Sequence, residues 1–272
     1  MKKLAILLLI LVLFAGCAQL PQPAQPTPAP QPTATARQST RVLFIGDSLS
    51  QGLDGLFPRL AASGSPPVTV ESKSMWRGGF PLEQQWEFTK APDEIRTGKW
   101  DTVVLEEDLL DTWPDGVDKY HQYARQFDQE IKKAGAETVL VMAYPDRDVE
   151  APTTEDMAAA YGKSGQELGV KVAPVALAFR RSLQERPDLK LHAEDGDHSS
   201  WAGLYLLGCV LYATIFERSP VGLTYSGSGA APDEWEALTR MLMGEDCVLS
   251  EEDTAFLQRI AWETVRDYQV GR

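Results

Sequence analysis

Ser48 stands where the chain changes abruptly from apolar to polar residues. The run RVLFIG, at residues 41–46, is typical of a buried strand, and Gly-Asp-Ser follows it directly. The polar segment after this serine is expected to start a helix. The Ser48 N–H then lies at a helix N-terminus, where developing negative charge is stabilised. Such a serine is well placed to act as a nucleophile, provided that a base removes its proton.

The search for that base leads to His198. The chain has three histidines, which are His121, His192 and His198. His121 falls in an amphipathic helical pattern and is expected to be structural, whereas His198 lies in the polar loop HAEDGDHSS. Asp195 precedes His198 by three residues, a spacing that lets a carboxylate fold back and orient the imidazole. Asp197 competes for this role but is adjacent to the histidine in sequence, a poorer geometry, so we expect a triad of Ser48, Asp195 and His198.

A metal site is the competing interpretation of the same loop. Its ligands would be His192, Glu194, Asp195, Asp197 and His198, an oxygen-rich set with two imidazoles. We favour the triad, which needs no metal and no organic cofactor.

Alternating strands and helices position these residues. Short, continuous apolar runs predict strands at 41–46, 68–72, 101–107, 137–143 and 170–175. Helical patterns are recognised at 116–135, 153–169, 199–217, 232–244 and 250–268. We expect Thr153 or Thr154 to cap the second of these helices, Gly169 to end it, and Ser250 to open the last one. We therefore expect a three-layer α/β/α sandwich with a flavodoxin-like parallel sheet in strand order 2-1-3-4-5. Residues 41–219 form the main domain, and 220–272 form a helical extension packed on it.

Two short blocks carry a resemblance to a known family. GDSLS at 46–50 and DGDH at 195–198 resemble the first and last blocks of the SGNH/GDSL hydrolases, over about residues 41–217. The resemblance implies a sandwich fold, a Ser48 nucleophile, and Asp195 and His198 as its partners. The lipase-type elbow G-x-S-x-G is absent.

The segment RGGFPLEQQW, at 77–86, resembles the second block of that family. In the family a glycine of this block donates its backbone N–H to the oxyanion. The resemblance therefore implies an oxyanion hole made by the N–H groups of Ser48 and Gly79, with Gly78 close behind. Trp76 and Trp113 are placed near the edge of the cleft, where packing is favoured over stacking on sugar rings.

The third block departs from the family pattern. The family places an asparagine there as an oxyanion donor, but this chain contains no asparagine, and Glu106, Glu107 and Asp108 occupy the region. An ionised carboxylate accepts hydrogen bonds and cannot donate them. VVLEE resembles the VVLQE of divergent members, whose third block is rebuilt, and Glu106 could donate if burial kept it protonated. Asp47, Gly78, Glu106, Glu107 and Asp108 are our candidates for the substrate cleft.

The N-terminus resembles an export signal. Two lysines precede an apolar run, and LFAGC ends it like a bacterial lipobox, so we expect a lipoprotein signal peptide at 1–16 and a lipidated Cys17. Residues 17–40 are rich in proline and poor in large apolar side chains, which predicts an extended tether. The chain is expected on the outer face of a bacterial membrane.

Composition narrows the choice of partner. The formal net charge of −13 argues against nucleic acid. The other two of the three cysteines are Cys209 and Cys247, and the sequence does not decide whether these two form a disulfide. The expected function is that of a lipid-anchored serine esterase acting on small or glycan O-acyl esters. The alternative is a degenerate relative that binds a cell-surface ligand without turnover.

Overall fold

The computed structural model describes residues 39–107, 113–225, 234–243 and 247–271, which all fall within one compact unit, Arg37–Arg272. The predicted signal peptide, Cys17, nearly all of the predicted tether and Asp108 lie outside the described residues.

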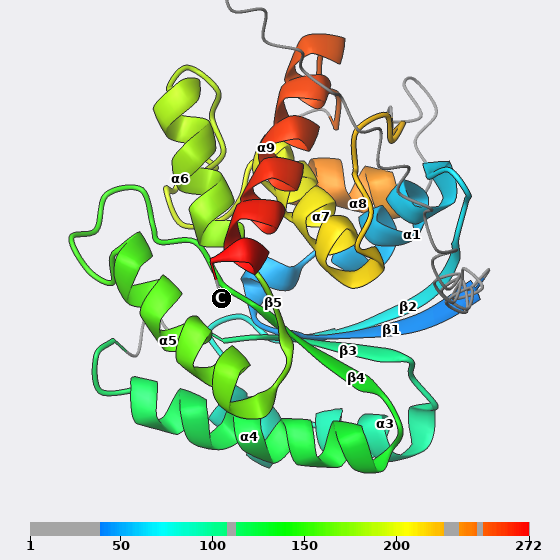
Figure 1. The fold of residues 1–272 in the computed structure, drawn as a ribbon, viewed down its shortest axis with the longest axis vertical. Coiled ribbons are helices and arrows are strands. Elements are labelled where there is room, and N and C mark those ends of the chain that lie inside the picture. Colours follow the sequence, from blue (N-terminus) through cyan, green and yellow to red (C-terminus); the bar gives the residue numbers. More distant parts are fainter. Residues whose placement is uncertain (1–38, 108–112, 226–233, 244–246, 272) are drawn as a thin grey trace, which may run out of the picture. The chain divides into compact units, whose positions relative to one another are not determined.

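A parallel sheet forms the middle layer (Figure 1). Its strands are β1 (Ser39–Gly46), β2 (Thr69–Trp76), β3 (Thr102–Glu106), β4 (Glu137–Val141) and β5 (Lys171–Ala173). Their order, β2-β1-β3-β4-β5, confirms the predicted topology. The interior strand β1, flanked by β2 and β3, is fully buried from Val42 to Ile45, which explains why its sequence is continuously apolar there.

Several strand boundaries differ from the prediction. β1 begins at Ser39, inside the segment assigned to the tether, because Ser39 and Thr40 pair with Thr69 and Val70. β2 continues to Trp76, beyond the expected end at residue 72, through its full register with β1. β5 ends at Ala173, and the residues after it turn into a helix instead of continuing the strand.

Helices cover both faces of the sheet, which confirms the three-layer sandwich (Figure 1). One face carries α2 (Leu82–Phe88), α3 (Ala91–Gly98), α4 (Val117–Lys133) and α5 (Thr154–Leu168). The other carries α1 (Leu53–Ser63), α6 (Val175–Glu185), α7 (Trp201–Phe216), α8 (Glu234–Met243) and α9 (Glu251–Val270). The prediction omitted α2, α3 and α6, and gave only the start of α1.

The predicted helix ends are held by the expected caps. At the start of α5, the side chains of Thr153 and Asp156 form reciprocal hydrogen bonds with each other's backbone N–H. Gly169 ends the same helix in the left-handed conformation, with φ of 64°. The Ser250 side chain accepts from the Asp253 N–H at the start of α9.

Helix α7 is apolar on all sides and almost entirely buried, because it lies between the sheet and α9. The C-terminal helix α9 packs on α7 and α6, as expected for an extension of the same domain. Among the described residues, Cys209 and Cys247 are both buried and are not bonded to each other. None of the described helices has the length and apolar character that crossing a membrane requires.

The first turn of α7 approaches the preceding loop so closely that only glycine fits. A Cβ at Gly203 would overlap the carbonyl oxygen of Leu191, which accepts a hydrogen bond from the Ser200 N–H at 2.9 Å. This contact fixes the loop that carries His198 against the start of α7.

We predict that Gly203→Ala lowers the free energy of unfolding by about 1–3 kcal/mol, because overpacking forces the backbone to move. A loss of stability would be informative, because replacing glycine by alanine in a helix interior normally raises the free energy of unfolding by about 1 kcal/mol. Urea denaturation measures the change. Gly271→Ala is the control, because a Cβ there makes only an ordinary contact, 3.5 Å from the Asp267 carbonyl oxygen. Equal or higher stability of Gly203→Ala would contradict the packing described.

Candidate active site

The structure brings Ser48, His198 and Asp195 together at the carboxyl edge of the sheet. The His198 Nε2 lies 3.0 Å from Ser48 Oγ, and the His198 Nδ1 lies 3.0 Å from Asp195 Oδ2. With a neutral imidazole, Nδ1–H donates to the carboxylate and Nε2 accepts the serine O–H. This is the connectivity that a serine nucleophile and its base require.

Ser48 is held by a short helical turn at the end of β1. The turn, η1 (Ser48–Ser50), is capped by Asp47, whose Oδ1 accepts from the Leu49 N–H at 2.8 Å. Its backbone is closed by the Gln51 N–H, which donates to the Ser48 carbonyl at 3.1 Å. Ser48 remains partly exposed, whereas its neighbours Asp47 and Leu49 are buried. The turn therefore presents the hydroxyl to solvent from a fixed backbone.

Asp195 orients His198 from within the same loop. Its Oδ2 accepts from the imidazole, and its Oδ1 accepts from the backbone N–H groups of Asp197 and His198, each at 3.1 Å. The competing carboxylate, Asp197, lies 3.6 Å from His198 Nδ1, farther than Asp195. The geometry therefore favours Asp195 as the orienting carboxylate.

Opposite electrostatic effects act on this pair. Partial burial would raise the pKa of Asp195, but hydrogen bonds from the His198 ring and from two backbone N–H groups outweigh it and lower the pKa. For His198 partial burial would lower the pKa, but the hydrogen bond to Asp195 and the charges of Asp197, Asp195 and Asp47 raise it. The imidazole is thus a stronger base than an isolated histidine.

Sequence reasoning missed the residues that hold the His198 loop from outside. Arg147, in the segment after β4, donates its backbone N–H to the Gly196 carbonyl at 2.8 Å. Its guanidinium donates to the carbonyls of Ala193 and Glu194, at 3.2 and 3.3 Å. Nothing in the sequence links Arg147 to this loop, because a contact to backbone carbonyls leaves no pattern in the residues contacted.

His192 supports the same loop and does not face the other candidate metal ligands. Its Nε2 lies 3.0 Å from the Pro145 carbonyl oxygen, and its ring packs edge-on against Tyr144 and Phe179. Burial lowers the pKa of His192, which favours a neutral ring. Within the described parts of the chain, no group of three or more His, Cys, Asp or Glu side chains is arranged to hold a metal ion. The geometry therefore gives the metal interpretation no support.

His121 is structural, as its helical pattern indicates. It is buried in α4, and its Nδ1 lies 2.7 Å from Ser164 Oγ on α5. The interaction joins two helices on the face of the sheet opposite to α7.

Gly79 lies in a turn directly after β2. The Phe80 N–H donates to the Arg77 carbonyl, and the Arg77 N–H donates to the Gly46 carbonyl, both at 3.1 Å. The second bond fixes the turn beside the end of β1, next to Ser48. Gly79 has φ of 64°, in the region that favours glycine, and a Cβ on Gly78 or Gly79 would meet open space. An open backbone at this place is suited to donate an N–H to a ligand.

The buried carboxyls of the third block point into the protein. Glu106, the last residue of β3, is 1% exposed, and its Oε2 accepts from the Asp47 N–H at 2.8 Å. Glu107 is 2% exposed, and its Oε2 accepts from the Leu82 N–H at 2.8 Å, at the start of α2. Asp47 is 4% exposed. Burial of Asp47, Glu106 and Glu107 contradicts their assignment to the substrate cleft, because their carboxyls hold backbone N–H groups instead.

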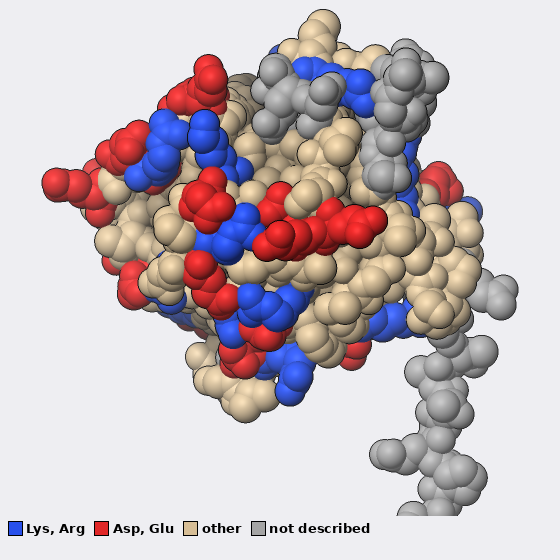
Figure 2. Space-filling view, turned by 90° about the horizontal axis from the view of Figure 1, so that it is seen from above, with Lys and Arg blue, Asp and Glu red and all other residues tan. Residues whose placement is uncertain are grey.

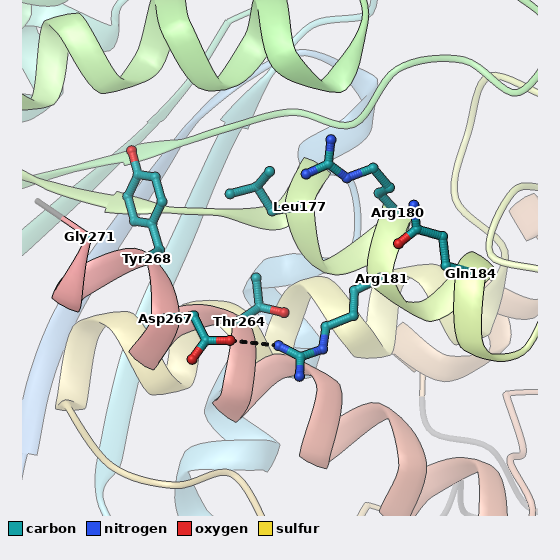
Figure 3. Close-up of a pocket in the computed structure, with 8 residues that line it drawn as sticks. All are labelled: Leu177, Arg180, Arg181, Gln184, Thr264, Asp267, Tyr268 and Gly271. Atoms are coloured by element: carbon teal, nitrogen blue, oxygen red, sulfur yellow. Dashed lines mark hydrogen bonds and ion pairs between the residues drawn. The ribbon is translucent and has the colours of Figure 1, made fainter.

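A cavity of about 480 Å³ lies elsewhere, between α6 and α9 (Figure 3). Its lining includes Arg181 and Asp267, which form an ion pair at 2.9 Å, and Tyr268 near the end of α9. Neither Ser48 nor His198 lines it. This cavity is therefore not part of the candidate site.

Charged side chains are intermixed on the surface. On the face shown in Figure 2, acidic and basic side chains are interspersed. Many of these opposite charges form ion pairs among the described residues, for example Arg186 with Asp253 and Arg259 with Glu185. The exclusion of nucleic acid stays a prediction from the net charge.

Comparison with known proteins gives structural matches only. No protein-family model matches the chain, and no curated protein matches its sequence. The solved structures that resemble it include a candidate SGNH hydrolase from Slackia heliotrinireducens, with 24% identity and a TM-score of 0.53 over 65% of this chain and 99% of that one. They also include Axe2, an acetylxylan esterase from Geobacillus stearothermophilus, with 16% identity and a TM-score of 0.55 over 65% and 94%.

A third similar structure extends further along the chain. A DUF4886 family protein from Bacteroides uniformis has 14% identity and a TM-score of 0.62, over 84% of this chain and 95% of that one. At such identities the likeness concerns the fold alone. The chain has the fold of the SGNH/GDSL hydrolases, in a divergent form.

We predict that Asp195→Asn and Asp197→Asn separate the roles of the two carboxylates. Asp195→Asn should lower kcat by about 10³–10⁴, because the imidazole loses its orientation and the partner of its cation. Asp197→Asn should leave kcat within a few-fold of wild type. Steady-state kinetics with a short-chain ester measure both. Equal losses in the two variants would contradict the assignment of Asp195.

The raised pKa of His198 sets a pH dependence. A histidine base works only when neutral, so for hydrolysis with His198 as base we expect kcat/KM to rise with pH through a midpoint above 6.5, the value of an unperturbed histidine. Asp197→Asn should move this midpoint to lower pH, because it removes a charge that raises the pKa. An unchanged midpoint in that variant, or one below 6.5 in wild type, would contradict the electrostatics described.

Proposed function

We propose that this chain is a serine hydrolase of the esterase type, and more specifically that it cleaves O-acyl esters through Ser48, His198 and Asp195. One observation carries the proposal. Ser48 Oγ lies 3.0 Å from His198 Nε2, and the opposite ring nitrogen lies 3.0 Å from Asp195 Oδ2, at the carboxyl edge of a parallel sheet. Ligands bind at this edge in such sheets. The fold shared with SGNH hydrolases and acetylxylan esterases supports the same reaction class.

The reaction proceeds by acyl transfer to Ser48. Its Oγ attacks the ester carbonyl carbon while His198 Nε2 takes the proton, and Asp195 stabilises the resulting imidazolium. The carbonyl oxygen becomes an oxyanion, which accepts hydrogen bonds from the N–H groups of Ser48 and Gly79. Collapse expels the alcohol, which takes the proton from His198. Water then attacks the acyl-enzyme with His198 again as base, and the acid leaves.

A glycan O-acetyl ester is the substrate class that we favour. The acetylxylan esterase among the similar structures motivates this choice. Trp76 adds an observation from the chain itself: it is 42% exposed and pairs with Gly46 in the sheet, two residues before Ser48. Trp76 is thus more exposed than the packed position that the sequence favoured for it. An exposed indole beside the nucleophile offers an apolar face to a sugar ring.

The lipid anchor stays part of the proposal. Cys17 and the export signal lie outside the described residues, so attachment to the outer face of a bacterial membrane rests on the sequence alone. Intact-mass analysis of the protein from a bacterial membrane fraction would test it, since lipidation at Cys17 removes residues 1–16 and adds acyl chains.

We predict that the purified protein hydrolyses p-nitrophenyl acetate and releases acetate from acetylated xylo-oligosaccharides. Ser48→Ala and His198→Ala should each lower kcat by on the order of 10⁴ or more, because the nucleophile and its base act as a unit. Ser219→Ala, which changes an exposed serine after α7, is the matched control and should keep full activity.

Two results would overturn the proposal. Hydrolysis by wild type that survives Ser48→Ala would place the nucleophile elsewhere. A folded wild type that hydrolyses no ester would favour the alternative of a ligand-binding protein without turnover, for which the glycan itself becomes the ligand to test.

A further inference from the structure

The loop that carries Asp195 and His198 is closed by backbone contacts where it begins and ends. The Ala193 N–H donates to the His198 carbonyl at 2.8 Å, and the next pair outward, His192 and Ser199, forms an isolated antiparallel bridge. His192 is therefore the residue at which the chain enters this loop. Its neighbour in sequence bonds directly to the backbone of His198, so the position of His192 is passed on to the candidate base.

The His192 side chain is anchored outside the loop, on the segment that follows β4. Its Nε2 lies 3.0 Å from the Pro145 carbonyl oxygen, which can only accept a hydrogen bond, so Nε2 carries the ring proton. The ring packs edge-on against Tyr144 and Phe179, which are buried and stacked on each other with ring centroids 4.0 Å apart. Two buried rings and one carbonyl thus fix the orientation of this imidazole.

We propose that His192 is a positioning residue for the catalytic base: by donating its Nε2–H to Pro145, it fixes the loop so that the His198 ring meets Ser48. The catalytic part of this inference rests on the function proposed above. His192 acts through the backbone of Ala193 and is not itself a catalytic residue. A misplacement of about 1 Å can cost on the order of 100-fold in rate, so a hydrogen bond remote from the reacting atoms can still control the reaction.

Charged groups act on both histidines. Those that act on His192 are Arg147, Asp148 and Asp195, and those that act on His198 are Asp197, Asp195 and Asp47. Burial lowers the pKa of His192, so its ring is neutral at neutral pH. Partial burial lowers the pKa of His198 as well, but the hydrogen bond to Asp195 and the carboxylate charges outweigh it. A loop that loses its anchor should weaken this hydrogen bond and bring the pKa of His198 back toward 6.5.

Kinetics with p-nitrophenyl acetate test this role. His192→Phe keeps an aromatic ring without a donor, and it should lower kcat about 10-fold with little change in KM, because a misplaced base slows the chemical step. His192→Gln supplies an N–H donor again and should keep kcat within about three-fold of wild type. His121→Phe is the matched control: His121 is 7% exposed, as is His192, and is hydrogen-bonded to Ser164 on the opposite face of the sheet, so its loss should leave kcat unchanged.

An NMR titration of the histidine rings tests the same role without turnover. The chain has only three histidines, so His121→Phe and His192→Phe assign all three ring signals. The His198 midpoint should lie above 6.5 in wild type, fall in His192→Phe and stay in place in His121→Phe. An unchanged midpoint in His192→Phe, or a His192→Gln variant as impaired as His192→Phe, overturns the inference. A wild type that shows these midpoints but hydrolyses no ester instead overturns the proposed function and leaves the anchoring of the loop by His192 standing.

Discussion

The hydrogen bond between His198 Nε2 and Ser48 Oγ is the interaction on which the account depends. Its partners are 150 positions apart in the sequence, so the whole fold must deliver them to one point. The sheet does this by placing β1 between β2 and β3, where the buried end of the strand fixes Ser48. The loop that carries His198 lies near the C-terminal end of the main domain in sequence, far from Ser48. The helix that follows it, α7, is apolar on all sides and anchors the loop in the core.

Carboxyl groups dominate the electrostatics around this bond, and their effects differ with burial. Asp195 and Asp197 are about half exposed, so they act on His198 through hydrogen bonding and partly screened charge. Asp47 and Glu106 are nearly inaccessible to water, and an uncompensated charge there would be costly. Their carboxyl oxygens accept hydrogen bonds from the backbone N–H groups of the turn. The same residue types thus strengthen a base at the surface and brace a turn in the interior.

The features predictable from sequence are those that local patterns encode. Continuous apolar runs indicated the strands, and the alternation with helices gave the strand order. Thr153, Gly169 and Ser250 marked helix ends through capping chemistry that involves only nearby residues. Ser48, Asp195 and His198 came from residue type and spacing, because Asp195 and His198 belong to one loop and Ser48 follows a recognisable strand.

What could not be predicted depends on long-range contacts. Helix α1 contains Pro58, and α2 has only seven residues, so both give weak periodic signals. Glu106 looked like a group facing the cleft because its sequence position cannot tell which way a strand-end side chain points. Arg147 escaped notice because it binds backbone carbonyls, which every residue carries.

The most direct test of the central claim is the reaction of the purified protein with a fluorophosphonate, followed by peptide mass mapping. A serine made nucleophilic by His198 should carry the adduct at Ser48, and the adduct should disappear in His198→Ala although Ser48 remains. A folded wild type that takes up no label, or label on Ser48 that persists without His198, would contradict the account.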